Sequence, residues 1–327
     1  MTDDDSARGG RVVVGVDGGG SKTDAVALTL DGAVVARTSA AGSSPHFVGV
    51  EESVRRIDAL VRDVSGGREV AQANLYLSGI DLPIEVDVFR DGISHLDWAS
   101  GSTVIDNDLY ALLRAGTSAR DAVAVVCGSG INAIGRRSDG ATARFASLGV
   151  ISGDWGGGTG IGETALYDAV RGNDLRGPAT SLTEAIPPVF GLAAIDQVTE
   201  AMHLGTLQYS DLGRLSPLVF EQADAGDTVS IALVTRQGTE IALMAISAIE
   251  RLGMTSQPIP VVLGGGVVAA GHPLLLEAVR SALDARTPLA EIVLVPARPI
   301  IGAALLALET AGASPEAVEH ARRELER

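Results

Sequence analysis

The residues best suited to chemistry lie near the start of the chain, in the segment DGGGSKT at residues 17–23. Three glycines separate a carboxylate, Asp17, from an ammonium, Lys22, and the segment follows a run of valines. Glycine turns expose backbone N–H groups that can approach phosphate oxygens, because no Cβ stands in the way. The segment therefore predicts phosphate binding, and its context decides which kind of loop provides it.

Two familiar nucleotide-binding motifs do not match this segment. A P-loop needs glycine where Ser21 stands, and a dinucleotide fingerprint needs glycine where Thr23 stands. Both motifs also lead into a helix, whereas the runs AVALTL and AVVAR follow here, joined by Asp31 and Gly32. Two β-rich runs joined by Asp-Gly predict a hairpin with a type I′ turn. The glycines are therefore expected between two strands.

A second segment, CGSGINAIG at residues 127–135, repeats this design. An apolar strand, a glycine turn, a second strand, Asp-Gly and a third strand follow one another in both places. The interval from Gly20 to Gly32 equals that from Gly128 to Gly140. The agreement in spacing predicts a duplicated strand–turn–strand module.

Composition limits the class of protein. The 327 residues are 46% hydrophobic but only 3% aromatic, and the net charge is −16. That charge argues against nucleic acid as a partner, because such binding draws on clustered Lys and Arg. A single cysteine, Cys127, excludes a disulfide framework and favours a reducing compartment. Residues 1–10 are unlike a signal peptide, and no apolar run reaches the roughly 18–20 residues of a membrane helix, so we expect a cytoplasmic protein without a membrane partner.

The apolar patterns predict alternating strands and helices. Strands are expected at 11–16, 25–30, 33–38, 73–81, 122–130 and 291–297, and the segment 258–271 is expected to be a buried strand followed by three glycines. Helices are expected at 51–64, 161–172, 193–203, 211–225, 227–253, 273–285 and 299–312. Residues 102–116 are expected to run from a short strand into a helix, with Asp106 and Asp108 at the junction.

These features together resemble the actin, hexokinase and heat-shock-ATPase superfamily. Within it, DGGGSKT, CGSGINAIG and VVLGGGV at 261–267 resemble the BadF/BadG/BcrA/BcrD ATPase family, in its N-acetylglucosamine and glucosamine kinase branch. The resemblance runs from about residue 12 to 312. It implies an α/β fold of two actin-like, ribonuclease H-like domains with ATP and substrate in the cleft between them. The expected division is a disordered tail at 1–10, one domain at 11–117 plus 299–327, and another at 118–298.

The resemblance also implies which residues hold ATP and Mg²⁺. Asp17 would anchor Mg²⁺ through water, since that ion gives up its waters reluctantly. Three glycine segments would hold the phosphates and the adenosine: Gly18, Gly19, Gly20, Ser21, Lys22 and Thr23; Gly128, Ser129 and Gly130; and Gly264, Gly265 and Gly266.

The expected general base is Asp106. A carboxylate at a strand-to-helix junction can accept a proton from a sugar hydroxyl that attacks phosphorus. Asp108 is the competing candidate. Its purely structural interpretation is an acid in the first turn of the helix, where the helix dipole favours a negative charge. Similarity to the aspartate of the kinases' TTDA segment favours Asp106.

Similarity to the sugar kinases is weaker at the expected substrate site. Ser44 stands where amino-sugar kinases usually have Asn, and Leu148 stands roughly where the mammalian acetylglucosamine kinase has Trp. GDWGGGTGIGETAL at 153–166 resembles the family's GDEGS segment, with Trp155 in the place of an acid. The expected substrate residues are Ser44, His46, Ser78, Gly79, Asp81, Asn132, Leu148 and Asp154.

We expect a homodimeric, ATP-dependent kinase of an amino sugar, with N-acetylglucosamine favoured over glucosamine. The family's activators carry a [4Fe–4S] cluster that needs two cysteines from each protomer, so the single Cys127 excludes that branch. The five histidines show no zinc-ligand spacing. Two alternatives stay open: a nucleotide-switched sensor, and a kinase of a non-sugar or peptidoglycan-derived alcohol.

Overall fold

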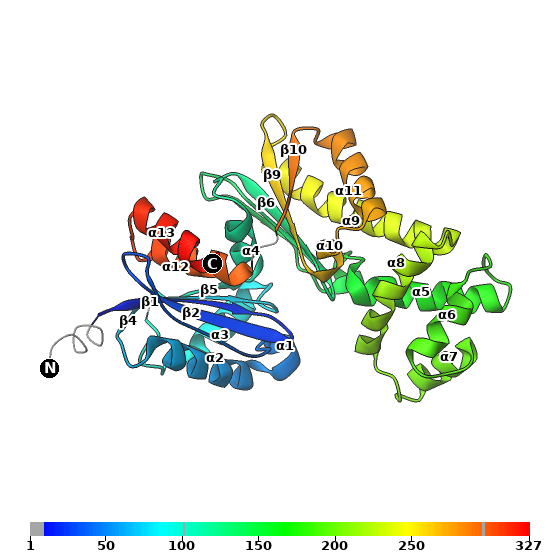
Figure 1. Cartoon of the computed structure of the whole chain (residues 1–327), viewed down its shortest axis with the longest axis horizontal. Helices are drawn as coiled ribbons and strands as arrows, with labels where there is room; N and C mark the ends of the chain where they lie inside the picture. The colour runs from blue at the N-terminus through cyan, green and yellow to red at the C-terminus, as the bar shows by residue number, and fades with distance from the viewer. Residues whose placement is uncertain (1–9, 101, 296–297) are drawn as a thin grey trace. The chain divides into compact units, whose positions relative to one another are not determined.

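The computed structural model describes residues 10–100, 102–295 and 298–327. Residues 1–9 of the expected tail and residues 296–297 of the expected last strand lie outside this part. The chain divides into two compact units, the first comprising residues up to Ala119 together with Val295–Arg327, and the second Arg120–Leu294 (Figure 1).

The first unit is built on a five-stranded sheet in the order β3-β2-β1-β4-β5. The first three strands form antiparallel hairpins, while β4 and β5 run parallel to β1. The central strand is a run of valines buried on both faces, as a continuous apolar strand in a mixed sheet should be. The strands are β1 (Val12–Gly18), β2 (Lys22–Thr29), β3 (Val34–Ala41), β4 (Val70–Leu77) and β5 (Val104–Asn107).

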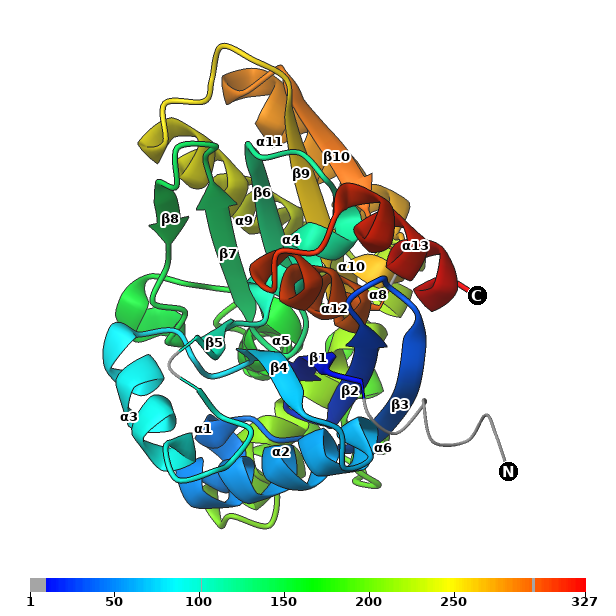
Figure 2. The same ribbon diagram turned by 90° about the vertical axis from the view of Figure 1, so that its left-hand side faces the viewer.

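Helices cover both faces of this sheet. Figure 2 shows α2 (Val50–Ser65) on one face and α12 (Pro299–Thr310) on the other. The small residues of α12 pack closely on the sheet, because a Cβ on Gly15 of β1 would lie 2.6 Å from the Ala304 nitrogen. The other helices of this unit are α1 (Pro45–Val48), α3 (Pro83–Ile93), α4 (Leu109–Gly116) and α13 (Pro315–Leu325).

The second unit repeats the topology of the first. Its sheet has the order β10-β9-β6-β7-β8, so β6, β7 and β8 take the places of β1, β2 and β3, and β9 and β10 those of β4 and β5. The predicted duplication is thereby confirmed for the whole sheet. The strands are β6 (Ala122–Cys127), β7 (Ile131–Arg136), β8 (Thr142–Arg144), β9 (Ile259–Gly264) and β10 (Ala290–Leu294).

The helical part of the second unit packs around α9 (Thr228–Arg251). Among the described helices, only α9 is long and apolar enough to cross a bilayer, but 61% of its apolar window is buried inside the protein, so it is a core helix. The others are α5 (Gly157–Asn173), α6 (Leu182–Val189), α7 (Ile195–His203), α8 (Ser216–Asp224), α10 (Gly266–Ala269) and α11 (Pro273–Arg286), with 3-10 turns η1 (Gly149–Ser152) and η2 (Tyr209–Leu215).

The Asp-Gly turns differ from the predicted type I′ geometry, which needs positive φ at both central residues. Gly32 has a φ of 91° and Gly140 a φ of 92°, whereas their aspartates are not among the described residues with positive φ. Each glycine N–H donates to the residue three positions back, Thr29 at 3.0 Å and Arg137 at 2.9 Å. Both turns are therefore three-residue loops that end in a left-handed glycine.

Candidate functional site

The first glycine loop joins β1 to β2, as predicted, and no helix follows it. Gly18 pairs with Thr23, and the Gly19 N–H donates to the Lys22 carbonyl at 2.9 Å. A neighbouring segment braces the loop, because the Ser43 N–H donates to the Gly19 carbonyl at 3.1 Å and the Thr23 hydroxyl donates to the Ser43 hydroxyl at 2.7 Å. The loop is thus a fixed turn with exposed backbone.

Asp17 lies immediately before this loop, at the end of β1. Burial and the nearby carboxylates of Asp108 and Asp24 together raise the pKa of Asp17 to about 8, while Lys22 opposes the rise. Carboxylates crowded in this way are stabilised by a bound cation. Their oxygen donors fit Mg²⁺, and a bound divalent ion would offset the repulsion that raises this pKa.

The junction of β5 and α4 holds both candidates for the general base, of which the sequence analysis favoured Asp106 over Asp108. Asp106 is a strand residue in register with Tyr76, and its carboxylate accepts the Asn107 N–H at 2.8 Å. Asp108 follows the strand at the start of α4 and is the carboxylate whose charge acts on Asp17. Burial, together with the charge of Asp81, raises the pKa of Asp108 to about 7. A pKa near 7 is the property that a general base needs near neutral pH.

Asn107 fixes this junction from between the two acids. Its side-chain N–H donates to the Asp81 carboxylate at 2.8 Å, and its side-chain oxygen accepts the Leu109 N–H at 3.0 Å. The end of β5 is therefore tied both to the segment after β4 and to the first turn of α4.

The segment SGID after β4 lies against the first glycine loop and the loop before α1. The Ser78 N–H donates to the Gly18 carbonyl at 2.8 Å. Gly79 has a φ of 80°, and a Cβ on it would lie 2.8 Å from the Ser44 hydroxyl and 2.9 Å from the His46 ring. The Ser78 hydroxyl is buried without a hydrogen-bond partner among the described residues. The structure thus brings together Ser44, His46, Ser78, Gly79 and Asp81.

Glu85 joins these two segments, and the sequence analysis missed it. One carboxylate oxygen accepts the backbone N–H groups of Asp81 and Leu82, both at 2.8 Å, and the other pairs with the His46 ring at 2.8 Å. The signal was present in L-P-I-E at 82–85, since an acid three residues after a helix N-cap reaches back to it. The donor atoms of His46, Asp81 and Glu85 lie within 4.8 Å of one another, an arrangement that sequence spacing does not reveal.

The second unit brings its own three glycine turns to one end of its sheet. The loop at 128–130 joins β6 to β7, and its carbonyls accept N–H groups from the start of α5: Gly158 to Gly128 at 2.7 Å and Thr159 to Ser129 at 3.0 Å. A Cβ on Gly157 would overlap Gly130, and one on Gly265 would overlap the Cys127 carbonyl. Only glycine allows these three turns to pack backbone to backbone.

The other expected residues of this unit lie near these turns. Asn132 is on β7, where its side-chain oxygen accepts the Ala133 N–H at 2.7 Å. Leu148 begins η1 and is 40% exposed, and the Asp154 carboxylate accepts the Ser152 hydroxyl at the end of that turn. Trp155 donates to the Thr164 hydroxyl at 3.0 Å, and the Arg236 guanidinium stacks over its ring at 3.8 Å.

Gln237 of α9 is a second residue that sequence reasoning missed. Its side chain is fully buried, and its oxygen accepts the Gly157 N–H at 2.9 Å. Its side-chain nitrogen is buried without a hydrogen-bond partner among the described residues. Gln237 therefore anchors the first turn of α5, which in turn holds the loop at 128–130.

Comparison with known proteins decides the family. The BadF/BadG/BcrA/BcrD ATPase family matches residues 14–307. The chain belongs to this family. An N-acetyl-D-glucosamine kinase of Dictyostelium discoideum is 29% identical over 315 residues, covering 91% of this chain and 98% of that protein. An N-acetylmuramic acid/N-acetylglucosamine kinase of Clostridium acetobutylicum is 27% identical over 263 residues, covering 79% of this chain and 86% of that protein.

Solved structures of other proteins share the fold. A Chromobacterium violaceum protein, solved as a candidate N-acetylglucosamine kinase, superimposes with a TM-score of 0.70 at 22% identity, covering 91% of this chain and 99% of that one. A Streptomyces griseus glucokinase of the ROK family, solved with glucose and AMPPNP, gives a TM-score of 0.55 at 17% identity, covering 90% and 98%. The predicted two-domain, actin-like α/β fold is thereby confirmed.

Proposed function

We propose that the protein is an ATP-dependent kinase that phosphorylates a hydroxyl of an amino sugar, with N-acetylglucosamine favoured over glucosamine. The observation that carries the proposal is the carboxylate cluster of Asp17, Asp81 and Asp108 beside the first glycine loop. Phosphoryl transfer needs this combination of a base, a cation site and backbone donors for phosphate. The named activities of the Dictyostelium and Clostridium relatives support the same reaction.

Each part of the site has one task in this proposal. The loops at 18–23 and 128–130 hold the phosphates through backbone N–H groups, and the Lys22 ammonium also contacts the phosphates. The loop at 264–266 approaches the adenosine. Asp17 would hold Mg²⁺, which supplies charge neutralisation on the transferred phosphoryl group. Asp108 accepts the proton of the attacking hydroxyl, with Asp106 as the competing assignment.

The sugar is expected to contact residues from both units. Ser44, His46, Ser78, Gly79 and Asp81 supply hydroxyl, imidazole, backbone and carboxylate groups that match the hydroxyls of a sugar. Asn132, Leu148 and Asp154 are the proposed contacts from the second unit.

The proposal has four further parts: Mg²⁺ as the cation, a homodimer, a cytoplasmic location, and functional domains at 11–117 plus 299–327 and at 118–298. The near absence of cysteine and the dependence on ATP support the location. Analytical ultracentrifugation tests the dimer directly.

The test of the proposed function is ADP release from ATP and Mg²⁺ with a panel of acceptors. The panel comprises N-acetylglucosamine, glucosamine, N-acetylmannosamine, glucose and anhydro-muramic sugars. Stimulation by one amino sugar over the ATP-only rate supports the proposal and names the substrate. Tight ATP binding with no stimulation by any acceptor would favour the sensor instead.

The rate should depend on pH through Asp108. Because burial raises the pKa of Asp108 to about 7, the carboxylate is deprotonated and able to accept a proton only above that pH. We expect kcat/KM for the sugar, at saturating ATP, to fall about tenfold per pH unit below pH 7 and to level off above it. A profile that stays flat down to pH 5 would contradict the assignment, since an ordinary aspartate is still ionised there.

Removing the Gln237 anchor should weaken ATP binding more than sugar binding. Gln237→Met keeps the length of the side chain but leaves the buried Gly157 N–H unpaired, at a cost of about 1–3 kcal/mol that loosens the second glycine loop. We expect KM for ATP to rise about 5-fold or more, with KM for the sugar within about 2-fold. Gln257→Met, on an exposed glutamine, is the matched control. Equal increases in both KM values would contradict the anchoring role.

A further inference from the structure

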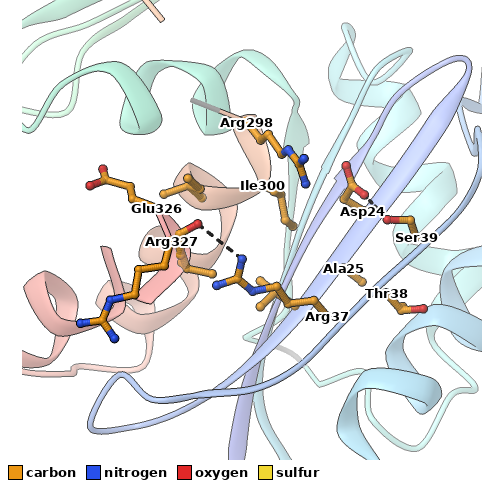
Figure 3. Close-up of a pocket in the computed structure, with 12 residues that line it drawn as sticks. Asp24, Ala25, Arg37, Thr38, Ser39, Arg298, Ile300, Glu326 and Arg327 are labelled. Atoms are coloured by element: carbon orange, nitrogen blue, oxygen red, sulfur yellow. Dashed lines mark hydrogen bonds between the residues drawn. The ribbon is translucent and has the colours of Figure 1, made fainter. Parts of the chain in front are cut away.

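The first unit contains a pocket that the proposed reaction does not use. It has a volume of about 530 Å³ and lies between the strands β2 and β3 and the start of α12 (Figure 3). Its lining includes Asp24, Arg37, Ser39, Arg298, Ile300 and Ile301. None of its lining residues is among those proposed to hold ATP, Mg²⁺ or the sugar.

Two arginines give this pocket a positive character. Figure 3 shows the side chains of Arg37 and Arg298 turned into the same space. Two N–H groups of Arg37 donate to the carbonyls of Glu324 at 2.6 Å and Leu325 at 3.4 Å, which fixes its guanidinium. The Arg298 side chain is exposed and makes no hydrogen bond or ion pair with the described residues.

The acidic residues of the pocket do not balance this charge. Asp24 is already paired with Lys22 at 2.7 Å. Of the other charged residues that line the pocket, Glu326 pairs with Arg322 at 3.4 Å and Arg327 with Glu324 at 2.6 Å. An unbalanced pair of guanidinium groups is notable in a chain whose net charge is −16.

We propose that this pocket binds a small anion that carries a phosphate group, held by Arg37 and Arg298. The guanidinium group matches phosphate because its N–H donors form a planar fork. The volume is larger than a single phosphate ion needs, and Ile300 and Ile301 supply an apolar wall. The pocket therefore suits a phosphate attached to an organic body of about the size of a sugar.

Asp24 connects the pocket to the first glycine loop. Its carboxylate accepts the Ser39 hydroxyl inside the pocket and pairs with Lys22, which the proposed function places on the ATP phosphates. An anion beside Asp24 makes the local potential more negative and holds Lys22 at Asp24, away from the nucleotide. Because an exposed ion pair is worth only about 0.2–1 kcal/mol, we expect KM for ATP to rise by about two- to fivefold. This effect on the rate, unlike the binding itself, rests on the proposed function.

Binding is tested first, without ATP or acceptor, by isothermal titration calorimetry with inorganic phosphate and with a hexose 6-phosphate. We expect saturable binding to the wild type, at least about fivefold weaker in Arg298→Gln, with an intermediate loss in Arg298→Lys. Arg280→Gln, on an exposed arginine of α11, is the control and should bind as the wild type does. Tighter binding of the hexose 6-phosphate than of phosphate identifies the organic body as part of the ligand.

Two results would overturn the proposal: no saturable binding of either probe to the wild type, or equal affinity in Arg298→Gln. Kinetics provide the second arm, with ATP varied at fixed hexose 6-phosphate. The inhibition should be lost in Arg298→Gln while its rate without the anion stays that of the wild type. Inhibition that persists in Arg298→Gln would place the anion at the ATP loops and contradict the pocket. A protein without kinase activity would still bind the probes, so failure of the proposed function can be distinguished from failure of the anion-binding proposal.

Discussion

Asp108→Asn should lower kcat by about 10²–10⁴-fold, the usual contribution of a general base, with KM for ATP within about twofold of the wild type. Asparagine keeps the size of the side chain and its hydrogen-bonding oxygen but cannot accept a proton. The environment of Asp108 supports the size of this effect, because burial and Asp81 already hold its pKa near 7, where proton transfer from a sugar hydroxyl is most effective.

Asp106→Asn is the decisive comparison. Asp106 lies two residues earlier and accepts the neighbouring Asn107 N–H, a contact that the asparagine oxygen can replace. We therefore expect less than about a fivefold loss of kcat for this variant. The measurement is steady-state ADP release with the best acceptor of the panel, and Asp63→Asn, on the exposed face of α2, controls for loss of charge alone. A larger loss in Asp106→Asn than in Asp108→Asn would restore the sequence-based assignment.

The sequence analysis favoured Asp106, but the roles of the two acids depend on where β5 ends, which the sequence does not show. Both stand in the short run IDND, and residues two apart in a strand point to the same side of the sheet, so only the end of the strand distinguishes their positions. In the structure the strand ends at Asn107, and Asp106 is in register with Tyr76. The two glycine hairpins, in contrast, were predictable because turn chemistry and strand pattern are local signals.

Residues that act through contacts distant in the sequence could not be predicted, because no local signal marks them. Gln237 lies 80 positions from the Gly157 N–H that it accepts, and it looks like one polar residue among many on a helix.

Some whole helices were also missed. The helix α6 contains Pro187 and Pro188, which read as helix breakers, and α3 follows the predicted strand at 73–81 with Pro83 at its start. The predicted helix at 211–225 is two elements, η2 and α8, and the strand expected to reach 297 ends at Leu294.

Asp17→Asn should abolish Mg²⁺-dependent turnover and yet make the protein without ligands more stable at alkaline pH. The first effect follows from the loss of an anionic oxygen at the proposed cation site. The second follows from the pKa of Asp17, which burial and the charges of Asp108 and Asp24 raise from 3.8 to about 8. Between about pH 4 and pH 8, Asp17 therefore keeps its proton in the folded protein but has already lost it in the unfolded chain.

The sign of the pH dependence follows from this difference. Because the folded state binds more protons in that range, its stability falls as pH rises through it, and the loss is complete above about pH 8. Asparagine cannot ionise, so the variant escapes the loss. We expect its Tm to exceed that of the wild type at pH 8.5, by about 2–4 °C for each kcal/mol regained, and the two values to converge near pH 4.

Mg²⁺ with ATP should reverse the order of the two Tm values. This reversal separates a carboxylate that binds the cation from one that only destabilises the fold when it ionises. Ligands that bind the folded state raise its stability by mass action, so they should raise Tm in the wild type and much less in Asp17→Asn. Thermal unfolding at pH 8.5 with and without Mg²⁺ and ATP measures both effects in one experiment. A variant that is less stable than the wild type at pH 8.5 without ligands would show that Asp17 is a paired anion in the folded state. The crowding of carboxylates around the first glycine loop would then already be compensated within the protein, and the argument for a cation at this site would lose its physical basis.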